Sequence, residues 1–518
     1  MTNPPNCAAL RANRYEIIFF LEVLFMLKFW RSHVDYQSFV SDTISSFSET
    51  ELLKLQSYSK SREKLDSLNL DPIGVLLAPY YSNTGRPAKN QPEILRSFVL
   101  MMDLGFTSID RWQKYLKNDF ILSTLIGCTL DSLPPLGSYY DFIDRLWLRN
   151  PEFEKNGRND LFSSGKNKKP SQKPGKGKKL ANRHSGITEI IADHIRSEKD
   201  FPFYYEELLQ QLFSLAAVVP SCNIGLIDTN DLTISGDGTC VHAHANSYGH
   251  KKCNCLEQGI LNCTCDRHYS DVDASWGWDS DLNAYYYGHT LYMFSYHNNQ
   301  IGTDVPLHIR FFDAKRHDSV SALICLSEFR NLHPDLTIKN ICLDSANDNY
   351  ATYQLLHDWD ICPFIDLNTN RGRPSSIPDN IQIDTDGTPL CQAGYRMVNW
   401  GMCPQKHARK WRCPVACGKE EACDCKSNCS PSAYGRCIYT KPEWDLRLYP
   451  PVPRGTEEYK KIYNNRTGSE RVNDRILNDY KLHSMHIHGK KRFSFFTMIA
   501  GINIHLDAQI KYKQNLVI

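Results

Sequence analysis

The chain has 518 residues, of which 41% are hydrophobic and 11% are aromatic. This length is too great for a single hydrophobic core and predicts two to four domains, while the composition excludes a largely disordered protein. The formal net charge is only +2, so overall charge gives no argument for a nucleic-acid partner.

An apolar segment near the start of the chain, residues 15–30, is the one candidate for a membrane span. It carries Glu16, Glu22 and Lys28 and is shorter than about 20 residues, so it is expected to be a buried or dimer-forming helix instead. It lacks a signal-peptide cleavage site, and we therefore expect a cytoplasmic protein.

The N-terminal region, residues 1–163, is expected to be a helical domain that binds DNA ends or mediates dimerisation. Apolar residues at helical spacing predict helices over 91–104, 108–118 and 137–147. Seven lysines among glycines and prolines follow in residues 164–183, which predicts a flexible basic linker. The remaining residues, 184–518, form the predicted catalytic domain.

The first of three candidate catalytic carboxylates is Asp237. The apolar, β-branched run Leu232 to Ser235 predicts a short strand, and Gly236-Asp237-Gly238 follows at once. The flanking glycines allow a metal or a phosphate to approach the backbone closely. Taken alone, the same string also fits an ordinary turn.

The second candidate carboxylate, Asp344, follows the apolar run Ile341 to Leu343, which predicts a buried strand. Asp344 is therefore expected at the carboxyl end of a strand, where open α/β sheets bind ligands. Asp344 and Ser345 also offer an N-cap for a helix through Leu356, which is the structural alternative. Three further acids, Asp313, Asp348 and Asp366, are its nearest competitors, and Asp348 is the strongest because it lies one helical turn further on.

The third candidate carboxylate is Glu470. Tyr463, Arg466 and Glu470 have the spacing i, i+3, i+7, which places them on one helical face if the helix continues through Gly468. Alternatively, Ser469 could cap a helix that begins there. A glutamate on a polar helix can also be simply solvated.

Three carboxylates suit the chemistry of two divalent cations, which can hold both the attacking and the leaving oxygen of a phosphodiester displacement. Such cations prefer oxygen ligands. We expect Asp237 to bridge two Mg²⁺ or Mn²⁺ ions, with Asp344 and Glu470 completing the site.

Eleven of the nineteen cysteines form two clusters, over residues 253–265 and 403–437, in two predicted insertions near residues 246–280 and 391–440. In a reducing compartment such cysteines are thiols or metal ligands, and sets of four thiolates suit structural Zn²⁺. The alternative is a reduced loop without metal. The candidate ligands are Cys253, Cys255, Cys263 and Cys265 in the first insertion, with His268 as a spare, and Cys413, Cys417, Cys423, Cys425 and Cys429 in the second.

The three acidic strings resemble the catalytic motifs of the Asp-Asp-Glu transposases of bacterial insertion sequences. Further similar segments occur in the same order along the chain. They are residues 85–87, 94–96 and 135–142 of the N-terminal domain, and residues 288–292, 304–307, 314–319 and 363–368 around the acids.

The resemblance implies an α/β catalytic domain with the ribonuclease H fold, a mixed sheet flanked by helices. It implies a homodimer, associated with the bacterial nucleoid, that binds double-stranded DNA. Such an enzyme binds the inverted repeats of its own element, cleaves the ends, and joins the freed 3′-hydroxyl to target DNA.

Basic and aromatic residues around the third acid are the expected DNA contacts. One departure from the family pattern is Leu477, where many members have a lysine, and Lys481 is an inexact substitute on the same helical face. A second is His289, where a lysine is common. The residues assigned to DNA binding are Tyr463, Arg466, Arg471, Arg475, Lys481 and His289.

Two alternatives remain open from the sequence. A metal-dependent nuclease of the same fold would cut DNA without joining it. An inactive, zinc-stabilised DNA-binding remnant of a transposase would do neither.

Overall fold

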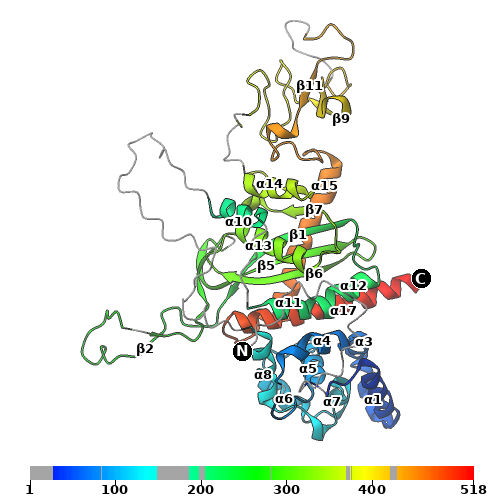
Figure 1. Ribbon diagram of the computed structural model, residues 1–518, viewed down its shortest axis with the longest axis vertical. Helices are drawn as coiled ribbons and strands as arrows, with labels where there is room; N and C mark the ends of the chain where they lie inside the picture. Colours follow the sequence, from blue (N-terminus) through cyan, green and yellow to red (C-terminus); the bar gives the residue numbers. More distant parts are fainter. Residues whose placement is uncertain are drawn as a thin grey trace. The chain divides into compact units, whose positions relative to one another are not determined.

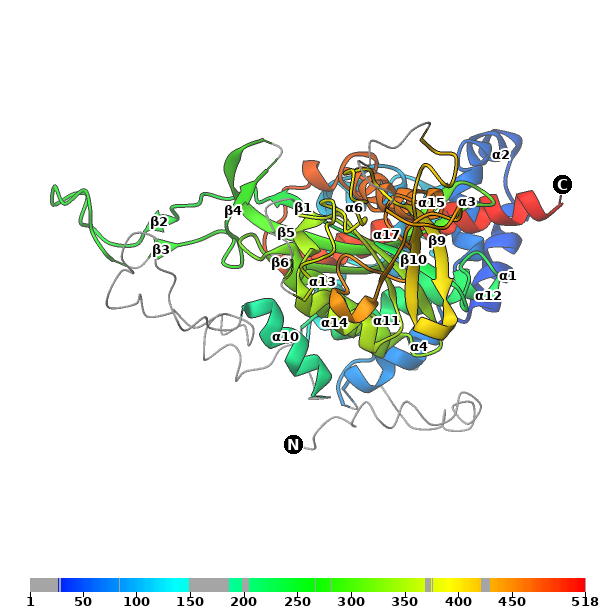
Figure 2. The same ribbon diagram turned by 90° about the horizontal axis from the view of Figure 1, so that it is seen from above.

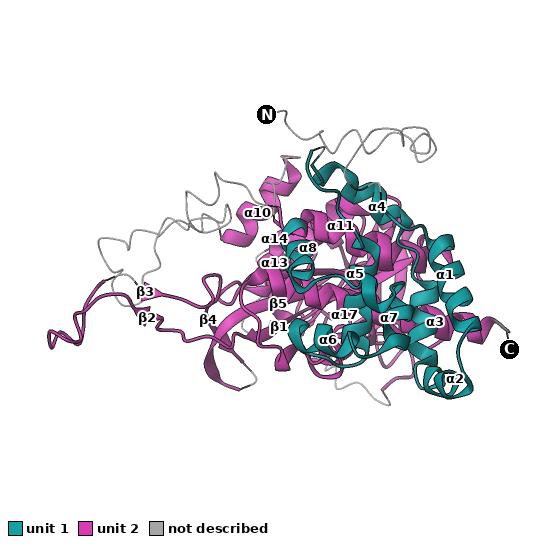
Figure 3. Cartoon of the chain, turned by 90° about the horizontal axis from the view of Figure 1, so that it is seen from below, with its two compact units in different colours: residues 1–145 teal, residues 146–518 magenta. Residues whose placement is uncertain are grey.

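The computed structural model divides into two compact units, residues 1–145 and 146–518 (Figure 3). The described residues are 27, 29–82, 84–148, 186–197, 205–265, 267–280, 282–368, 374, 376–420 and 429–517. The Lys-rich segment 164–183, most of the apolar segment 15–30, and Cys423 and Cys425 lie outside them.

The first unit is helical in the residues that are described, and the three helices predicted there are present. At its centre, α5 has every residue from Gln91 to Met102 buried. Ser97 of α5 accepts a hydrogen bond from the Trp112 indole at 2.8 Å and lies 2.8 Å from the Tyr139 hydroxyl, which ties three helices together. The elements are α1 (His33–Ser45), α2 (Glu49–Gln56), α3 (Ser59–Ser67), α4 (Asp71–Leu77), η3 (Ala78–Tyr80), α5 (Gln91–Asp103), α6 (Ile109–Leu116), α7 (Phe120–Ile126), η4 (Leu130–Ser132) and α8 (Leu136–Leu146).

The second unit is mixed α/β. Its strands are β1 (Leu232–His242), β2 (His250–Lys251), β3 (Arg267–His268), β4 (Ser275–Asp279), β5 (Ala284–Asn298), β6 (Thr303–Asp313), β7 (Ile338–Leu343), β8 (Cys362–Ile365), β9 (Val398–Cys403), β10 (Ala408–Arg412) and β11 (Cys437–Thr440). Its α-helices are α10 (Ile187–Arg196), α11 (Glu207–Phe213), α12 (Val219–Asn223), α13 (Asp318–Leu332), α14 (Tyr350–Asp358), α15 (Glu457–Tyr463), α16 (Thr467–Asp474) and α17 (Lys490–Val517). Shorter helical turns are η5 (Ser214–Val218), η6 (Ser345–Asn347), η7 (Pro404–Lys406), η8 (Pro442–Trp444), η9 (Asn464–Arg466), η10 (Arg475–Asp479) and η11 (Leu482–Ser484).

A mixed six-stranded sheet forms the centre of the second unit. The strand order is β4-β5-β1-β7-β8, and β6 also pairs with β5. β4 pairs with the first residues of β5 and β6 with the later ones, so both lie along the same edge of β5. β5 runs antiparallel to β1, whereas β7 and β8 run parallel to it.

Helices cover both faces of this sheet (Figure 1). α13 packs on β1, β5 and β6, and α10 lies against α13 and α14. The opposite face carries α16 and the long helix α17, whose Phe493 packs against Phe311 of β6. Among the described helices, none combines the length and the apolar character needed to cross a bilayer.

Two smaller sheets lie within the predicted Cys-rich insertions. β2 and β3 form a two-stranded ribbon in an arm that extends from the central sheet beyond β4 (Figure 2). β11, β10 and β9 form a three-stranded sheet over a small core of Cys391, Met397, Trp411 and Ile438.

Candidate active site

Asp237 and Asp344 lie side by side on neighbouring strands. In the parallel pairing of β1 with β7, Ser235 is opposite Cys342. The two acids each follow two residues later, which places them at the same level of adjacent strands, about 5 Å apart in backbone spacing. Asp237 lies within β1 rather than after it, because β1 continues through both flanking glycines and pairs with β5 as far as His242.

Asp344 does not cap the helix that was predicted after it. It is the N-cap of the short turn η6 without a side-chain capping bond, and Asn349 caps α14 by accepting from the amide of Thr352. An Asp344 carboxylate oxygen accepts a hydrogen bond from the Asn347 amide at 2.7 Å. Helix capping therefore does not account for Asp344.

Glu470 is brought to the sheet by a helical segment that continues through Gly468. The backbone remains helical from α15 through η9 into α16, and Ser469 caps nothing. Instead, the buried hydroxyls of Ser469, Ser235 and Ser295 form a triangle with 2.9 Å sides. Because Ser235 is two residues before Asp237, this triangle fixes α16 beside the first acid.

The electrostatics of Asp237 show that the acids form one cluster. Burial, followed by the negative charges of Asp318, Asp344 and Glu470, raises the pKa of Asp237 to about 7, while Arg466 opposes these effects. Arg466 forms an ion pair with Glu470 at 2.7 Å. A carboxylate whose pKa is raised by burial and by neighbouring acids is typical of a functional site.

Asp318 belongs to this cluster and was missed as a candidate from the sequence. It is the first residue of α13 and lies so close to β1 that a Cβ at Gly238 would be 2.5 Å from its Oδ1. Burial, and secondly the charge of Asp344, raise the pKa of Asp318 to about 6. Nothing in the sequence indicated this role, because a single acid in the first turn of a helix is common.

Two buried polar groups at the cluster lack hydrogen-bond partners within the described part of the chain. The Tyr292 hydroxyl is fully buried and would lie 2.7 Å from a Cβ at Gly236. Asn473 donates to Asp237 at 3.3 Å, while its own carbonyl oxygen has no partner. Unpaired buried groups are costly, so both are consistent with a polar ligand such as a hydrated cation.

The predicted DNA-binding residues differ in exposure and in their ion-pair partners. Arg471 pairs with both oxygens of Asp304 at 2.6 and 2.9 Å, and Arg475 pairs with Asp507 at 3.1 Å. Lys481 is exposed at a positive φ of 57° before η11.

Tyr463 and His289 point into the protein. Tyr463 packs against a buried cluster that includes Phe364, and burial, followed by the nearby Asp366 carboxylate, raises its pKa. His289 is fully buried with its Nε2 3.3 Å from Asp271. This position leaves no side-chain surface of His289 for a DNA phosphate, so that assignment needs correction. Phe493 of α17 packs against the His289 ring on this strand.

Asp348, the strongest competing acid, is occupied elsewhere. It is buried and accepts from Arg447 Nε at 2.7 and 2.8 Å, so it is not available as a metal ligand.

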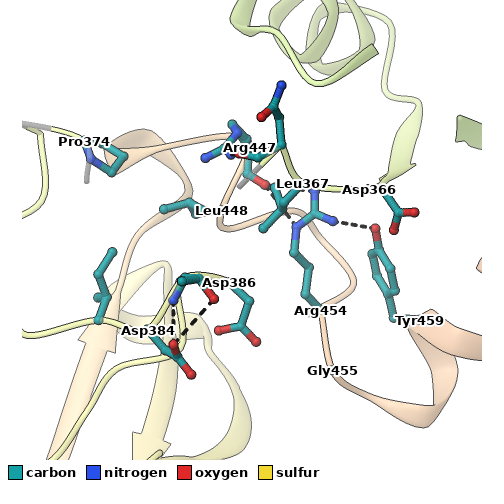
Figure 4. Close-up of a pocket in the computed structure, with 13 residues that line it drawn as sticks. Asp366, Leu367, Pro374, Asp384, Asp386, Arg447, Leu448, Arg454, Gly455 and Tyr459 are labelled. Atoms are coloured by element: carbon teal, nitrogen blue, oxygen red, sulfur yellow. Dashed lines mark hydrogen bonds between the residues drawn. The ribbon is translucent and has the colours of Figure 1, made fainter. Parts of the chain in front are cut away.

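Arg447 and Arg454 line a cavity of about 470 Å³ together with Asp366, Asp384 and Tyr459 (Figure 4). Both guanidinium groups are held by internal partners, which favours a structural role for these arginines.

The first cysteine cluster forms a possible metal site. The sulfur atoms of Cys253, Cys255, Cys263 and Cys265 lie within 4.8 Å of one another, with 3.5 Å between Cys253 and Cys263. His268 is not part of this group. For the second cluster, Cys413, Cys417 and Cys429 are described but do not form such a group among the described residues.

A second group of possible ligands, His308, Cys325 and Glu328, is buried beneath the sheet. Glu328 already pairs with His308 and Arg310, which accounts for its charge without a metal.

Comparison of the chain with protein-family models and with curated proteins finds no match to either.

Proposed function

We propose that this chain is a DNA transposase of the Asp-Asp-Glu type, which cleaves the ends of its own element and joins them to target DNA. The observation that carries the proposal is the convergence of Asp237, Asp344 and Glu470 from β1, the end of β7 and α16. These are the three acids expected from the sequence, and they come from separate parts of the chain.

The strand arrangement supports a ribonuclease H-like core. Leaving aside β4, the order is β6-β5-β1-β7-β8, with β5 antiparallel to β1 and the last two strands parallel to it. This is the strand order of that fold, with the first acid on β1 and the second directly after β7. Fold alone does not determine activity, so the proposal depends on the acids.

In this proposal the three acids would hold two hard divalent cations, Mg²⁺ or Mn²⁺. Carboxylate oxygens are the ligands that such ions prefer, and the unpaired Tyr292 hydroxyl and Asn473 carbonyl provide further polar groups nearby. When bound by Asp237, Asp344 and Glu470, the ions would stabilise the charge on the attacking and leaving oxygens of a phosphodiester displacement.

The surrounding side chains position these acids. Asn473 donates to Asp237 and orients its carboxylate, while Arg466 holds Glu470 through an ion pair one helical turn away. The buried serine triangle fixes the helix that carries Glu470 against β1. Such support of metal ligands by hydrogen bonds keeps them oriented for binding.

Double-stranded DNA is the substrate in this proposal, both as inverted repeats and as target. Arg466, Lys481 and the half-exposed side chain of Arg471 remain candidates for phosphate contacts beside the acids. Two DNA ends must be joined together, so a homodimer is the expected assembly.

We infer that the four cysteines of the β2-β3 arm hold a structural Zn²⁺, because tetrahedral thiolate sites stabilise loops that have no core of their own.

The test uses a DNA fragment that carries the repeats flanking the gene, with Mg²⁺ or Mn²⁺. The intact protein is expected to cut at the repeat ends, whereas Asp237→Asn and Glu470→Gln are expected to be inactive. Glu457→Gln is a matched control, because Glu457 is 90% exposed on the same helical segment. Cleavage that survives in both active-site variants would overturn the assignment of the acids.

A further inference from the structure

Asp318 lies against the backbone of β1 immediately beside the first acid. A Cβ at Gly238 would be 2.5 Å from its Oδ1 and 2.9 Å from its Cγ, so a side chain at this position would displace the carboxylate. Gly238 is opposite Tyr292 in the pairing of β1 with β5, and Asp237 is opposite Met293. The Gly-Asp-Gly string therefore presents an acid and also admits a second one from α13.

Asp318 and Glu470 approach β1 from opposite faces of the sheet. Ser469 contacts Ser235, so α16 lies on the face to which Asp237 also points, since side chains alternate along a strand. α13, which begins with Asp318, packs on the other face, the face of Gly238. The site is thus bounded by carboxylates from both sides of the sheet.

Helix capping does not explain Asp318. The N-cap of α13 is His317, whose ring accepts a hydrogen bond from the Ser319 amide at 3.3 Å. The Asp318 carboxylate itself has no hydrogen bond or ion pair with any residue that the structure describes. The charged form of a partly buried carboxylate beside Asp237 and Asp344 is unfavourable unless a cation or a proton compensates the charge.

A second observation points to a ligand at the same place. The Tyr292 hydroxyl is fully buried and has no hydrogen-bond partner in the described residues. It lies within the electrostatic influence of the negative charges of Asp318 and Asp344. Buried hydroxyl groups normally find a partner. A cation with its bound water would provide one between Tyr292 and the acids.

We propose that Asp318 is a fourth metal-binding carboxylate of this site and binds a hard divalent cation together with Asp237 and Asp344. The identity of the ion, Mg²⁺ or Mn²⁺, rests on the proposed function, but the assignment of Asp318 as a ligand does not require transposition.

The experiment measures Mn²⁺ binding to the full chain by calorimetry in the absence of DNA, with zinc already supplied. Asp318→Asn is expected to weaken at least one Mn²⁺ site about tenfold, which corresponds to about 1.4 kcal/mol. Asp110→Asn is the matched control, because Asp110 also lies in the first turn of a helix, α6, and pairs with Tyr140 at the surface. It is expected to bind Mn²⁺ like the intact protein.

A second variant, Gly238→Ala, displaces the Asp318 carboxylate without removing any charge, and we expect it to weaken the same Mn²⁺ site. Circular dichroism of each variant verifies the fold. Unchanged Mn²⁺ binding in Asp318→Asn, with loss in Asp237→Asn, would overturn the role of Asp318 and leave the proposed function intact. Weakened binding in Asp318→Asn by a protein that does not cleave DNA would support Asp318 and contradict the proposed function. An intact protein that binds no Mn²⁺ would overturn both.

Discussion

Replacing Asp237 by Asn should stabilise the metal-free protein at neutral pH. The pKa of Asp237 is about 7 in the folded chain, against an ordinary value of 3.8, because burial and neighbouring acids disfavour its charge. The folded state therefore binds this proton more tightly than the unfolded state does. As pH rises from about 4 to about 7, the carboxylate destabilises the fold progressively.

The magnitude follows from the difference between these pKa values. About three pH units correspond to about 4 kcal/mol at pH 8, as an upper limit. Because Asp237 is only partly buried, solvent screens part of the penalty, and we expect the variant to gain about 1 to 2 kcal/mol. Asn473 can still donate to the new amide oxygen, so the replacement leaves this contact in place.

Urea unfolding with a chelator present, at pH 5 and pH 8, measures this effect. The gain of Asp237→Asn over the intact protein should be larger at pH 8 than at pH 5, and Glu457→Gln should differ little from the intact protein at either pH. Saturating Mn²⁺ should reverse the order, because only the intact site binds it tightly. A variant that is less stable than the intact protein at pH 8 without metal would refute the reasoning.

Three further predictions concern the groups around the site. Cys263→Ser should lower the zinc content by about one ion per chain in elemental analysis, since it removes one of four adjacent thiolates, whereas Cys128→Ser should not. Arg471→Ala should lower the free energy of unfolding by at most about 1 kcal/mol in urea, because the Arg471 side chain is half exposed and the buried Asp304 keeps its contact with His297 at 2.8 Å; a larger loss would contradict this expectation. Ser469→Ala should cost about 1 kcal/mol and slow metal-dependent DNA cleavage, because it opens the serine triangle beneath Glu470; unchanged cleavage would argue against positioning by the triangle.

The sequence predicts the strands that carry the first two acids because apolar, β-branched runs have a clear pattern. Leu232–Ser235 and Ile341–Leu343 both lie in strands of the central sheet. The extension of β1 through Gly236 and Gly238 was not predictable, because the glycines suggest a turn. Close packing of Leu343 and Asp318 on these glycines decides the outcome, and such packing is a tertiary effect.

Contacts between distant segments account for the other differences. A Cβ at Gly468 would lie 2.6 Å from Asp304 of β6, which explains why a glycine stands within this helix. Asp348 and Asp344 look equivalent in sequence. Their roles differ because Arg447, from a loop later in the chain, pairs with Asp348. Asp318 is recognisable as part of the acid cluster only once α13 and β1 are packed together.

The most direct test of the account is strand transfer from a pre-cleaved repeat end with a free 3′-hydroxyl into a plasmid, in the presence of Mg²⁺. We expect joined products from the intact protein and none from Asp344→Asn. Cutting of uncleaved ends without any joining would indicate a nuclease. Neither cutting nor joining by well-folded, zinc-loaded protein would contradict the proposed transposase and favour a DNA-binding remnant.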